Sequence, residues 1–377
     1  MKKIIILISL MALFIPSIVM ATSASISGGV ILPNPQYTTG LTNFTLNASA
    51  TTKYAAIIKF AKTGTVNKVA IQAVSVSGSP TVTAEFQTLT SGLPSGSAYY
   101  GTNVSATTAI SAGWNVISLG TPITATTGDY VAIVITLIST GSNYFTLQGG
   151  LSPGIVTEFP YVATYTTSSW TASASVFPNI GIEYSDGVAY IPGVWAIATI
   201  TSDTTINTTT GLTPALLFQV PWSASISGII AHSRFPVNSG ATITLTTAAA
   251  PGTPLTNGTI TVTGGNEAAA ATGSQYYKFP ATIALTKNVD YLIQIVPTTT
   301  TSAILQNFTV GADVDTFHWL DAMGGGYKFR YSSCTATCGT AGNWTAVTTK
   351  RPMISIILNT FDDGTGTGGS GGGSYGY

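Results

Sequence analysis

The chain repeats itself, and this repeat constrains the fold more than any other feature of the sequence. Residues 55–135 resemble residues 215–295, and matching positions keep an almost constant offset in residue number. Five matches share one offset, 160: Phe60 with Val220, Val66 with Ile226, Val69 with Ile229, Gly92 with Gly252 and Pro94 with Pro254. Further along, Asp129-Tyr130 matches Asp290-Tyr291 with an offset of 161, and Trp170, Pro178, Ile180 and Ile182 match Trp344, Pro352, Ile354 and Ile356 with an offset of 174. Such regular spacing predicts an internal duplication.

The repeated unit has the pattern of short β-strands. Apolar or alternating runs recur every roughly 8–12 residues with Gly and Pro between them, which is typical of a sandwich or barrel. The alternation in 66–76 slips once at Ala73-Val74, which indicates either a β-bulge or a break between two strands. We predict an all-β protein made of two tandem antiparallel β-sandwich (jelly-roll-like) domains. In the first copy, strands are expected at 55–60, 66–76, 81–86, 114–119, 130–135, 144–147, 161–165, 170–172 and 178–184, with a turn at 92–96.

The composition excludes several classes of protein. Only 7% of the residues are charged and 45% are hydrophobic, and the formal net charge is +0. Intrinsic disorder requires low hydrophobicity and high net charge, so the chain should fold. Without a basic patch there is no electrostatic footprint for nucleic acid.

The N-terminus has the features of a secretory signal. Lys2 and Lys3 precede an apolar stretch at 4–19, and Val19-Met20-Ala21 offers a small-residue cleavage site. An uncleaved N-terminal anchor is the alternative. We therefore predict a secreted protein without a transmembrane segment in the mature chain. Its predicted parts are a signal peptide at 1–21, β-sandwich domains at 22–187 and 188–363, and a Gly-rich flexible tail at 364–377.

Two cysteines, Cys334 and Cys338, lie close together in the sequence. In an exported protein such a pair favours a local disulfide over free thiols. A metal site would need more ligands than this stretch offers.

The change of offset from 161 to 174 indicates 13 extra residues between Tyr291 and Trp344 in the second copy. This interval contains Asp313, Asp315 and Asp321. These three carboxylates are interpreted as solvated acids on a loop, as a Ca²⁺ site or as direct ligand contacts. The Ca²⁺ alternative arises because Ca²⁺ prefers oxygen ligands. We expect no other cofactor.

Aromatic side chains in the same interval suit a binding loop. Phe317, His318, Trp319, Asp321 and Tyr327 are candidate ligand residues, because a sugar ring can stack on an aromatic face while polar neighbours meet its hydroxyls. The structural alternative is that Phe317 and Trp319 cap the end of a sandwich.

Other conspicuous residues favour structural roles. Trp170 and Trp344 occupy matching hairpins, which indicates a plug of the core or its rim more than a ligand platform. Asp129 and Asp290 precede strands and should hydrogen-bond turn backbone. No set of residues indicates catalysis.

Seven Asn-x-Ser/Thr sequons make N-glycosylation a further prediction for a host that glycosylates. They begin at Asn43, Asn47, Asn103, Asn207, Asn257, Asn307 and Asn343.

The first copy resembles a known group of modules. Gly92-Leu93-Pro94-Ser95-Gly96 is followed by Trp114-Asn115-Val116-Ile117, Pro122-Ile123 and the strand 128–134. This order is similar to the jelly-roll-like β-sandwich modules of phage structural proteins and of bacterial and archaeal surface proteins, and to carbohydrate-binding modules. The second copy lacks the Trp114 match. The resemblance implies a fold and supplies no catalytic residues.

These observations predict a secreted, non-catalytic structural or adhesive protein of the cell surface that presents binding loops. Its partners would be other surface proteins, glycans or further copies of itself, with no nucleic acid. The alternatives are a carbohydrate-binding protein that uses residues 313–331, or a virion surface component. Because the chain has few charges to guard sheet edges, it should pair edges with other chains or cover them with an arm such as 22–54.

Overall fold

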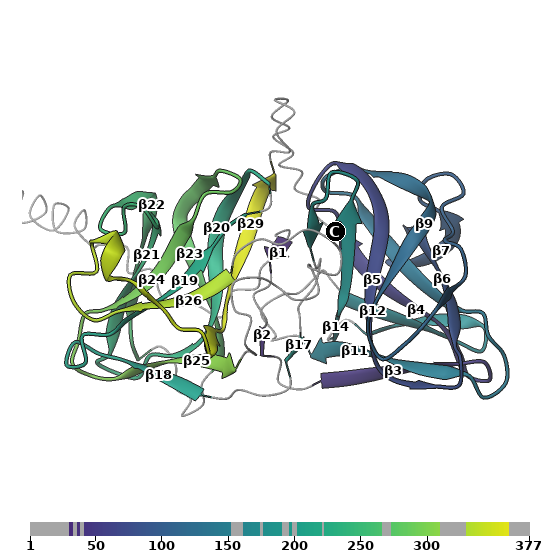
Figure 1. The fold of residues 1–377 in the computed structure, drawn as a ribbon, viewed down its shortest axis with the longest axis horizontal. Helices are drawn as coiled ribbons and strands as arrows, with labels where there is room; N and C mark the ends of the chain where they lie inside the picture. Colours follow the sequence, from purple (N-terminus) through teal and green to yellow (C-terminus); the bar gives the residue numbers. More distant parts are fainter. Residues whose placement is uncertain are drawn as a thin grey trace, which may run out of the picture.

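The computed structural model is all-β and consists of two lobes that lie side by side (Figure 1). It describes residues 30–32, 36–37, 41–151, 161–173, 176–190, 196–197, 202–220, 222–265, 273–309 and 329–361. We call residues 41–190 the N-terminal lobe and residues 202–361 the C-terminal lobe. The only helical element in these ranges is the 3₁₀ turn η2, Ala341–Asn343.

Two antiparallel sheets build the N-terminal lobe. Sheet I has the order β13-β12-β4-β10-β6-β7, with β8 also on β6, and sheet II has the order β14-β11-β5-β15-β16, with β3 on β11 and β9 on β5. The strands of sheet I are β4 (Thr51–Lys59), β6 (Thr81–Thr90), β7 (Leu93–Ala98), β8 (Thr108–Ala109), β10 (Tyr130–Leu137), β12 (Tyr161–Thr166) and β13 (Ser169–Ser173). Those of sheet II are β3 (Leu41–Asn47), β5 (Gly64–Ser77), β9 (Gly113–Ala125), β11 (Tyr144–Leu151), β14 (Val176–Pro178), β15 (Ile180–Tyr184) and β16 (Ala189–Tyr190).

The C-terminal lobe also has two antiparallel sheets. Sheet III has the order β22-β21-β24-β19-β26-β27, and sheet IV has the order β1-β29-β20-β25-β18, with β23 on β20 and β28 on β25. The strands of sheet III are β19 (Thr213–Phe218), β21 (Gly240–Thr247), β22 (Pro254–Thr263), β24 (Tyr291–Pro297), β26 (Phe329–Cys334) and β27 (Thr345–Ala346). Those of sheet IV are β1 (Val30–Leu32), β18 (Ser202–Ile206), β20 (Ala224–Arg234), β23 (Gly273–Leu285), β25 (Ala303–Thr309), β28 (Lys350–Pro352) and β29 (Ile354–Phe361).

The two lobes share one strand order. Sheet I read from β13 to β7 corresponds strand by strand to sheet III read from β27 to β22. In sheet II, β5 carries β9 and β15, just as β20 carries β23 and β29 in sheet IV. The register agrees as well: the irregularity that follows Val66 on β5 recurs after Ile226, its sequence match, on β20.

The cores follow from alternation along the strands. Inward-facing residues of β4 and β5, such as Ile58 and Val69, belong to one buried apolar cluster, so sheets I and II pack face to face as a β-sandwich-like layer pair. On β4 the intervening Ala55 and Ile57 are also fully buried, because Tyr161 and Trp170 cover the outer face of sheet I. Buried apolar residues of both lobes belong to the same contiguous cluster, so the lobes are in apolar contact.

The phase slip predicted near Ala73-Val74 is a β-bulge. Ala73 lies opposite Leu147 and Ser75 opposite Thr146, which leaves Val74 as the extra residue. Strand β5 therefore continues through the slip, and the second possibility, a break between two strands, is wrong.

The turn expected at 92–96 is shorter than predicted. Ser91 and Gly92 have φ values of 51° and 75°, and β7 begins directly afterwards at Leu93. Two successive residues with positive φ give the tight hairpin whose twist suits antiparallel strands.

The match of Tyr130 with Tyr291 is wrong by one position. Val131 lies opposite Ile58, and Tyr291 lies opposite Phe218, so Tyr291 corresponds to Val131 in strand register. Tyr291 is buried against Phe218, whereas Tyr130 is exposed.

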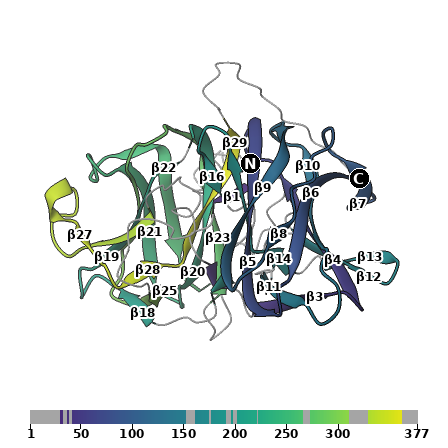
Figure 2. The same ribbon diagram turned by 45° about the vertical axis from the view of Figure 1, so that its right-hand side comes forward.

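Two short strands of the predicted N-terminal arm, β1 (Val30–Leu32) and β2, lie between the lobes (Figure 1). Strand β2 (Gln36–Tyr37) pairs in parallel with β17 (Ala196–Ile197), and both lie between the lobes, as does β1 (Figure 1). Figure 2 shows the same placement after a 45° turn. Of the arm predicted at 22–54, β1 reaches the C-terminal lobe, where it pairs with β29. The later part of that range is not an arm, because residues 41–47 form β3 of sheet II and β4 of sheet I begins at Thr51.

Candidate functional site

The edge of β29 is the most unusual feature of the molecule, because the strand that covers it comes from the opposite end of the described chain. Val30, Ile31 and Leu32 of β1 lie opposite Leu358, Ile357 and Ile356 in antiparallel register. In the N-terminal lobe the matching strand β15 is covered by β16, which follows it after a tight turn. The same position in the two lobes is therefore filled once by a neighbour and once by a distant arm.

The register shows how close this correspondence is. Ile182 of β15 lies opposite Tyr190 of β16, and its sequence match Ile356 lies opposite Leu32 of β1. Within the described residues the C-terminal lobe has no local hairpin at this edge, and β1 stands in its place.

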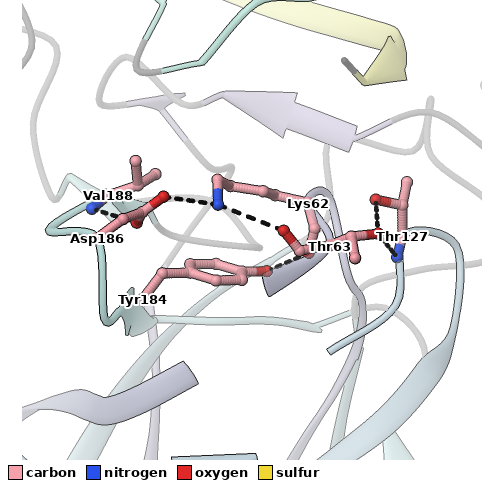
Figure 3. Close-up of polar contacts among 6 residues, drawn as sticks. All are labelled: Lys62, Thr63, Thr127, Tyr184, Asp186 and Val188. Carbon is pink, nitrogen blue, oxygen red and sulfur yellow. Dashed lines mark hydrogen bonds and ion pairs between the residues drawn. The ribbon is translucent and has the colours of Figure 1, made fainter. Parts of the chain in front are cut away.

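A polar cluster fixes the β15–β16 turn in the N-terminal lobe (Figure 3). The buried Lys62 donates from Nζ to Asp186 Oδ2 at 2.8 Å and lies 4.7 Å from the ring centre of Tyr184. The Tyr184 hydroxyl donates to the Lys62 carbonyl, and the Val188 N–H donates to Asp186 Oδ1. These contacts hold the turn that sends β16 back along β15.

Electrostatics link this cluster to the other lobe. Burial disfavours the charged form of Asp186, but hydrogen bonds from Lys62 and the Val188 N–H, together with the charges of Lys62 and Lys287, lower its pKa overall. Lys287 belongs to the β23–β24 turn of the C-terminal lobe, so the favourable charge interaction spans the two lobes.

The cross-strand pairs beside these edges differ between the lobes. On the outer face of sheet II, the buried Glu183 accepts a hydrogen bond from Lys68 at 2.9 Å. The matching cross-strand pair in sheet IV is Gly228 and Ile357, so an ion pair is replaced by a small and an apolar residue.

A second pair of matching positions also carries different residues in the two lobes. In the N-terminal lobe Gln72 accepts a hydrogen bond from the buried Asn179. Position 72 corresponds to His232, which is also buried, and burial lowers the pKa of His232 to about 4 while the charge of Asp203 acts in the opposite sense. The His232 backbone N–H donates to the carbonyl of Met353, the counterpart of Asn179.

The predicted disulfide between Cys334 and Cys338 is present, with Cα atoms 5.6 Å apart. It closes the β26–β27 turn, where Trp344 Nε1 donates to the Cys338 carbonyl. Trp344 packs on the outer face of sheet III, just as Trp170 packs on sheet I, and both are partly buried, as expected for plugs at the rim of the core. A Cβ on Gly252 would lie 2.9 Å from Gly339, so this turn is seated directly on the β21–β22 turn.

The extra residues predicted between Tyr291 and Trp344 fall into two places in the C-terminal lobe. Phe145 and Ala303 occupy matching positions in strand register, as do Ala163 and Ser332, and the offset in residue number grows between these two matches. It grows again across the disulfide turn, where Ala172 matches Ala346. One insertion therefore precedes β26, and the other is the turn itself.

The candidate ligand residues lie in the first of these insertions, outside the described residues. This applies to Asp313, Asp315, Phe317, His318, Trp319, Asp321 and Tyr327, so the sugar site and the Ca²⁺ site stay predictions. Among the residues that the structure does describe, no three His, Cys, Asp or Glu side chains are grouped as a metal site would require.

The side chains of Asp129 and Asp290, which were expected to bind turn backbone, contact other side chains. Asp129 accepts from the Tyr99 hydroxyl at 2.6 Å, and Asp290 accepts from Gln219 Nε2 at 2.6 Å. Burial, followed by this contact with Asp129, raises the pKa of Tyr99 to about 12.

The sequons differ in exposure. Asn103 is fully buried: its Oδ1 accepts from the Phe86 N–H, and its Nδ2 donates to the Phe86 carbonyl, so the side chain caps the open edge of β6. Asn307 is fully buried and donates to Thr204. In these two sequons, and in the buried Asn207, the folded protein gives a glycosylating enzyme no access to the amide nitrogen. Asn43, Asn257 and Asn343 are exposed and Asn47 is half-buried.

Local sequence carried little sign of these structural roles. Asn103 was recognised only as a sequon, and the backbone of Phe86 that it contacts lies on a separate strand. No protein-family model matches the chain, and comparisons with curated proteins and with solved structures found no match. Over the described residues, no helix is long and apolar enough to cross a membrane.

Proposed function

We propose that the protein is a secreted, non-catalytic structural or adhesive component of a cell surface, built as two tandem jelly-roll-like β-sandwich domains that arose by duplication. The common strand order of the lobes and the matching register of their sheets support the duplication. The strands form a rigid scaffold, and its loops carry the contacts to other surface proteins or glycans.

The observation that carries the proposal is the way in which polar side chains and short segments are used to cover sheet edges. The edge of β6 is covered in turn by β7, by the side chains of Asn103 and Ser105, and by β8. The edge of β29 is covered by β1. Covered edges suppress uncontrolled strand pairing and yield a durable scaffold, which is what a surface component requires.

The test is the behaviour of the purified mature chain at high concentration. We expect ordered filaments or lattices by electron microscopy, together with retention at the surface of the producing cells. A monomer that stays dispersed at high concentration and is released from the cells would contradict the structural role.

The same samples discriminate the carbohydrate-binding alternative. A glycan that changes the tryptophan fluorescence of the wild type, with the change lost in Trp319→Ala and kept in Trp170→Ala, would favour sugar binding by the predicted loop. No response across a broad glycan array would favour the structural role.

A further inference from the structure

We propose that β1 is an exchangeable strand and that the edge of β29 is the site where one copy of the protein receives the N-terminal arm of another. The inference rests on the proposed structural function and names its partner, a second copy of this chain. Self-assembly would then proceed by strand addition, in which backbone hydrogen bonds supply affinity.

The first support is the comparison of the two edges. Strand β16 is joined to β15 by a short turn that Lys62 and Asp186 hold in place, so it cannot leave its own lobe. Strand β1 fills the matching position on β29, but the two strands lie at opposite ends of the described chain, and no local turn ties them together. An identical strand from another copy would make the same backbone contacts.

The second support is the character of the strands. Val30, Ile31 and Leu32 lie opposite Leu358, Ile357 and Ile356, so neither strand places a charge in this register. Charged residues are a common device against pairing between chains, and no residue of these six supplies one. Pro33 directly follows β1 and restricts Leu32 to extended backbone, the conformation that strand addition requires.

The third support is reach. The stretch from Leu32 to Leu41 spans at most about 30 Å when fully extended. An arm of this length reaches the C-terminal lobe of its own chain or of a molecule packed directly beside it. Exchange would therefore produce a close-packed, head-to-tail assembly, and this geometry propagates when it does not close on itself.

The experiment uses cysteine pairs at matched positions. Ile31→Cys and Ile357→Cys are made as separate full-length variants, denatured together, refolded as a mixture at high concentration and oxidised. Opposite residues in antiparallel strands are close enough for a disulfide. We expect covalent dimers in the mixture and none in either variant alone. The matched control mixes Ala189→Cys with Glu183→Cys, which pair at the β15–β16 edge, and should give no dimers.

Each outcome decides the proposal. Dimers confined to the Ile31/Ile357 mixture support exchange. An intrachain crosslink in the Ile31→Cys/Ile357→Cys double variant, without dimers in the mixture, would show that β1 stays in its own chain and would overturn it. If neither the mixture nor the double variant gave a crosslink, the pairing of β1 with β29 would be overturned. Dimers in both mixtures would show non-specific association and would overturn an exchange specific to the β29 edge.

A second variant keeps the test independent of cysteine chemistry. Glycine at all three positions of β1 (V30G/I31G/L32G) should abolish assembly while hydrogen exchange shows both lobes folded. Assembly that persists would overturn the role of β1. It would leave the proposed structural function standing through other contacts, whereas a dispersed wild type would remove both.

Discussion

The two lobes place the same strands in the same register, yet they finish the corresponding edges differently. In the N-terminal lobe β16 folds back locally, and the ion pair of Lys68 and Glu183 lies beside it. In the C-terminal lobe the arm strand β1 covers the edge, and Gly228 and Ile357 replace the ion pair. The difference indicates that the same cross-strand position can hold either an ion pair or a pair of uncharged residues, provided that a further strand covers the sheet edge.

The same contrast holds at the edges of sheets I and III. In sheet I a side chain, Asn103, completes the edge of β6, whereas in sheet III the backbone of β22 runs along β21. There Gly258 approaches so closely that a Cβ would lie 2.8 Å from the Leu245 carbonyl. A polar residue that suggests a function in the sequence can therefore have a structural role, in which its side chain makes the hydrogen bonds that a neighbouring strand would otherwise make.

Breaking the Asn103 cap should have the largest effect. Asn103→Ala leaves the buried Phe86 N–H without its acceptor and opens a cavity, so we expect a loss of about 3–4 kcal/mol of unfolding free energy. Chemical denaturation measures the loss, and hydrogen exchange with mass spectrometry should assign it to the N-terminal lobe. Asn43→Ala removes an exposed sequon as a control and should change stability by less than about 0.5 kcal/mol. Equal effects of the two variants would contradict the capping role.

The second largest expected effect is a loss of stability at low pH that arises from His232 in the C-terminal lobe. The folded-state pKa of His232 is about 4 because burial disfavours its charged form. The unfolded value is about 6.5. The unfolded chain thus binds the extra proton first as the pH falls, so stability from this site is complete above about pH 6.5 and is lost between there and about pH 4. The loss is on the order of 3 kcal/mol.

His232→Gln installs the residue of the N-terminal lobe and should flatten this part of the profile of unfolding free energy against pH. Gln72→His is the reverse exchange and should introduce a smaller slope into the N-terminal lobe, because position 72 is only half-buried. An unchanged profile in His232→Gln would rule out His232 as the source.

The ion pair comes third. Lys68→Ala strands the buried Glu183 carboxylate, and because Lys68 itself is 33% exposed we expect a cost of only about 2 kcal/mol. The double variant Lys68→Gly/Glu183→Ile copies the C-terminal pair and should recover most of that loss. Urea unfolding of the wild type and the two variants checks this order, with Lys278→Ala, at an exposed lysine, as the surface control. A double variant less stable than Lys68→Ala would show that the lobes cannot exchange these pairs.

The scaffold was readable from the sequence because strands and turns leave local signals. The alternation along β5 predicted a strand, and its slip near Val74 coincides with a bulge. The local disulfide of Cys334 and Cys338 was equally readable, because their spacing and the predicted export both favour it.

Features that depend on the pairing of strands far apart in the sequence could not be predicted. Nothing near Val30 in the sequence indicates that β1 would cover β29, and Asp290 was matched to Asp129 because a similar dipeptide lies one position out of register. Backbone pairing between strands far apart in the sequence leaves no local pattern, so the pairing of β1 with β29 could be found only from the fold.

The smallest expected effect concerns two matching turn glycines. Gly252→Ala would place a Cβ 2.9 Å from Gly339 in the disulfide turn, and we expect a loss of about 1 kcal/mol. Without the disulfide the turn can move aside, so in the Cys334→Ser/Cys338→Ser background the cost should fall by half or more. In Gly92→Ala the alanine would have to adopt a positive φ, and its Cβ would lie close to the Tyr161 hydroxyl. The resulting loss of stability should not depend on the cysteines.

A double-mutant cycle on thermal unfolding measures the coupling of each glycine to the disulfide. If the coupling of Gly252 were no larger than that of Gly92, the disulfide turn would not be seated on the β21–β22 turn as a unit. Trp344 would then be held by its packing on sheet III and by its hydrogen bond to the Cys338 carbonyl, and the disulfide turn would add a closed loop to the lobe without bracing it.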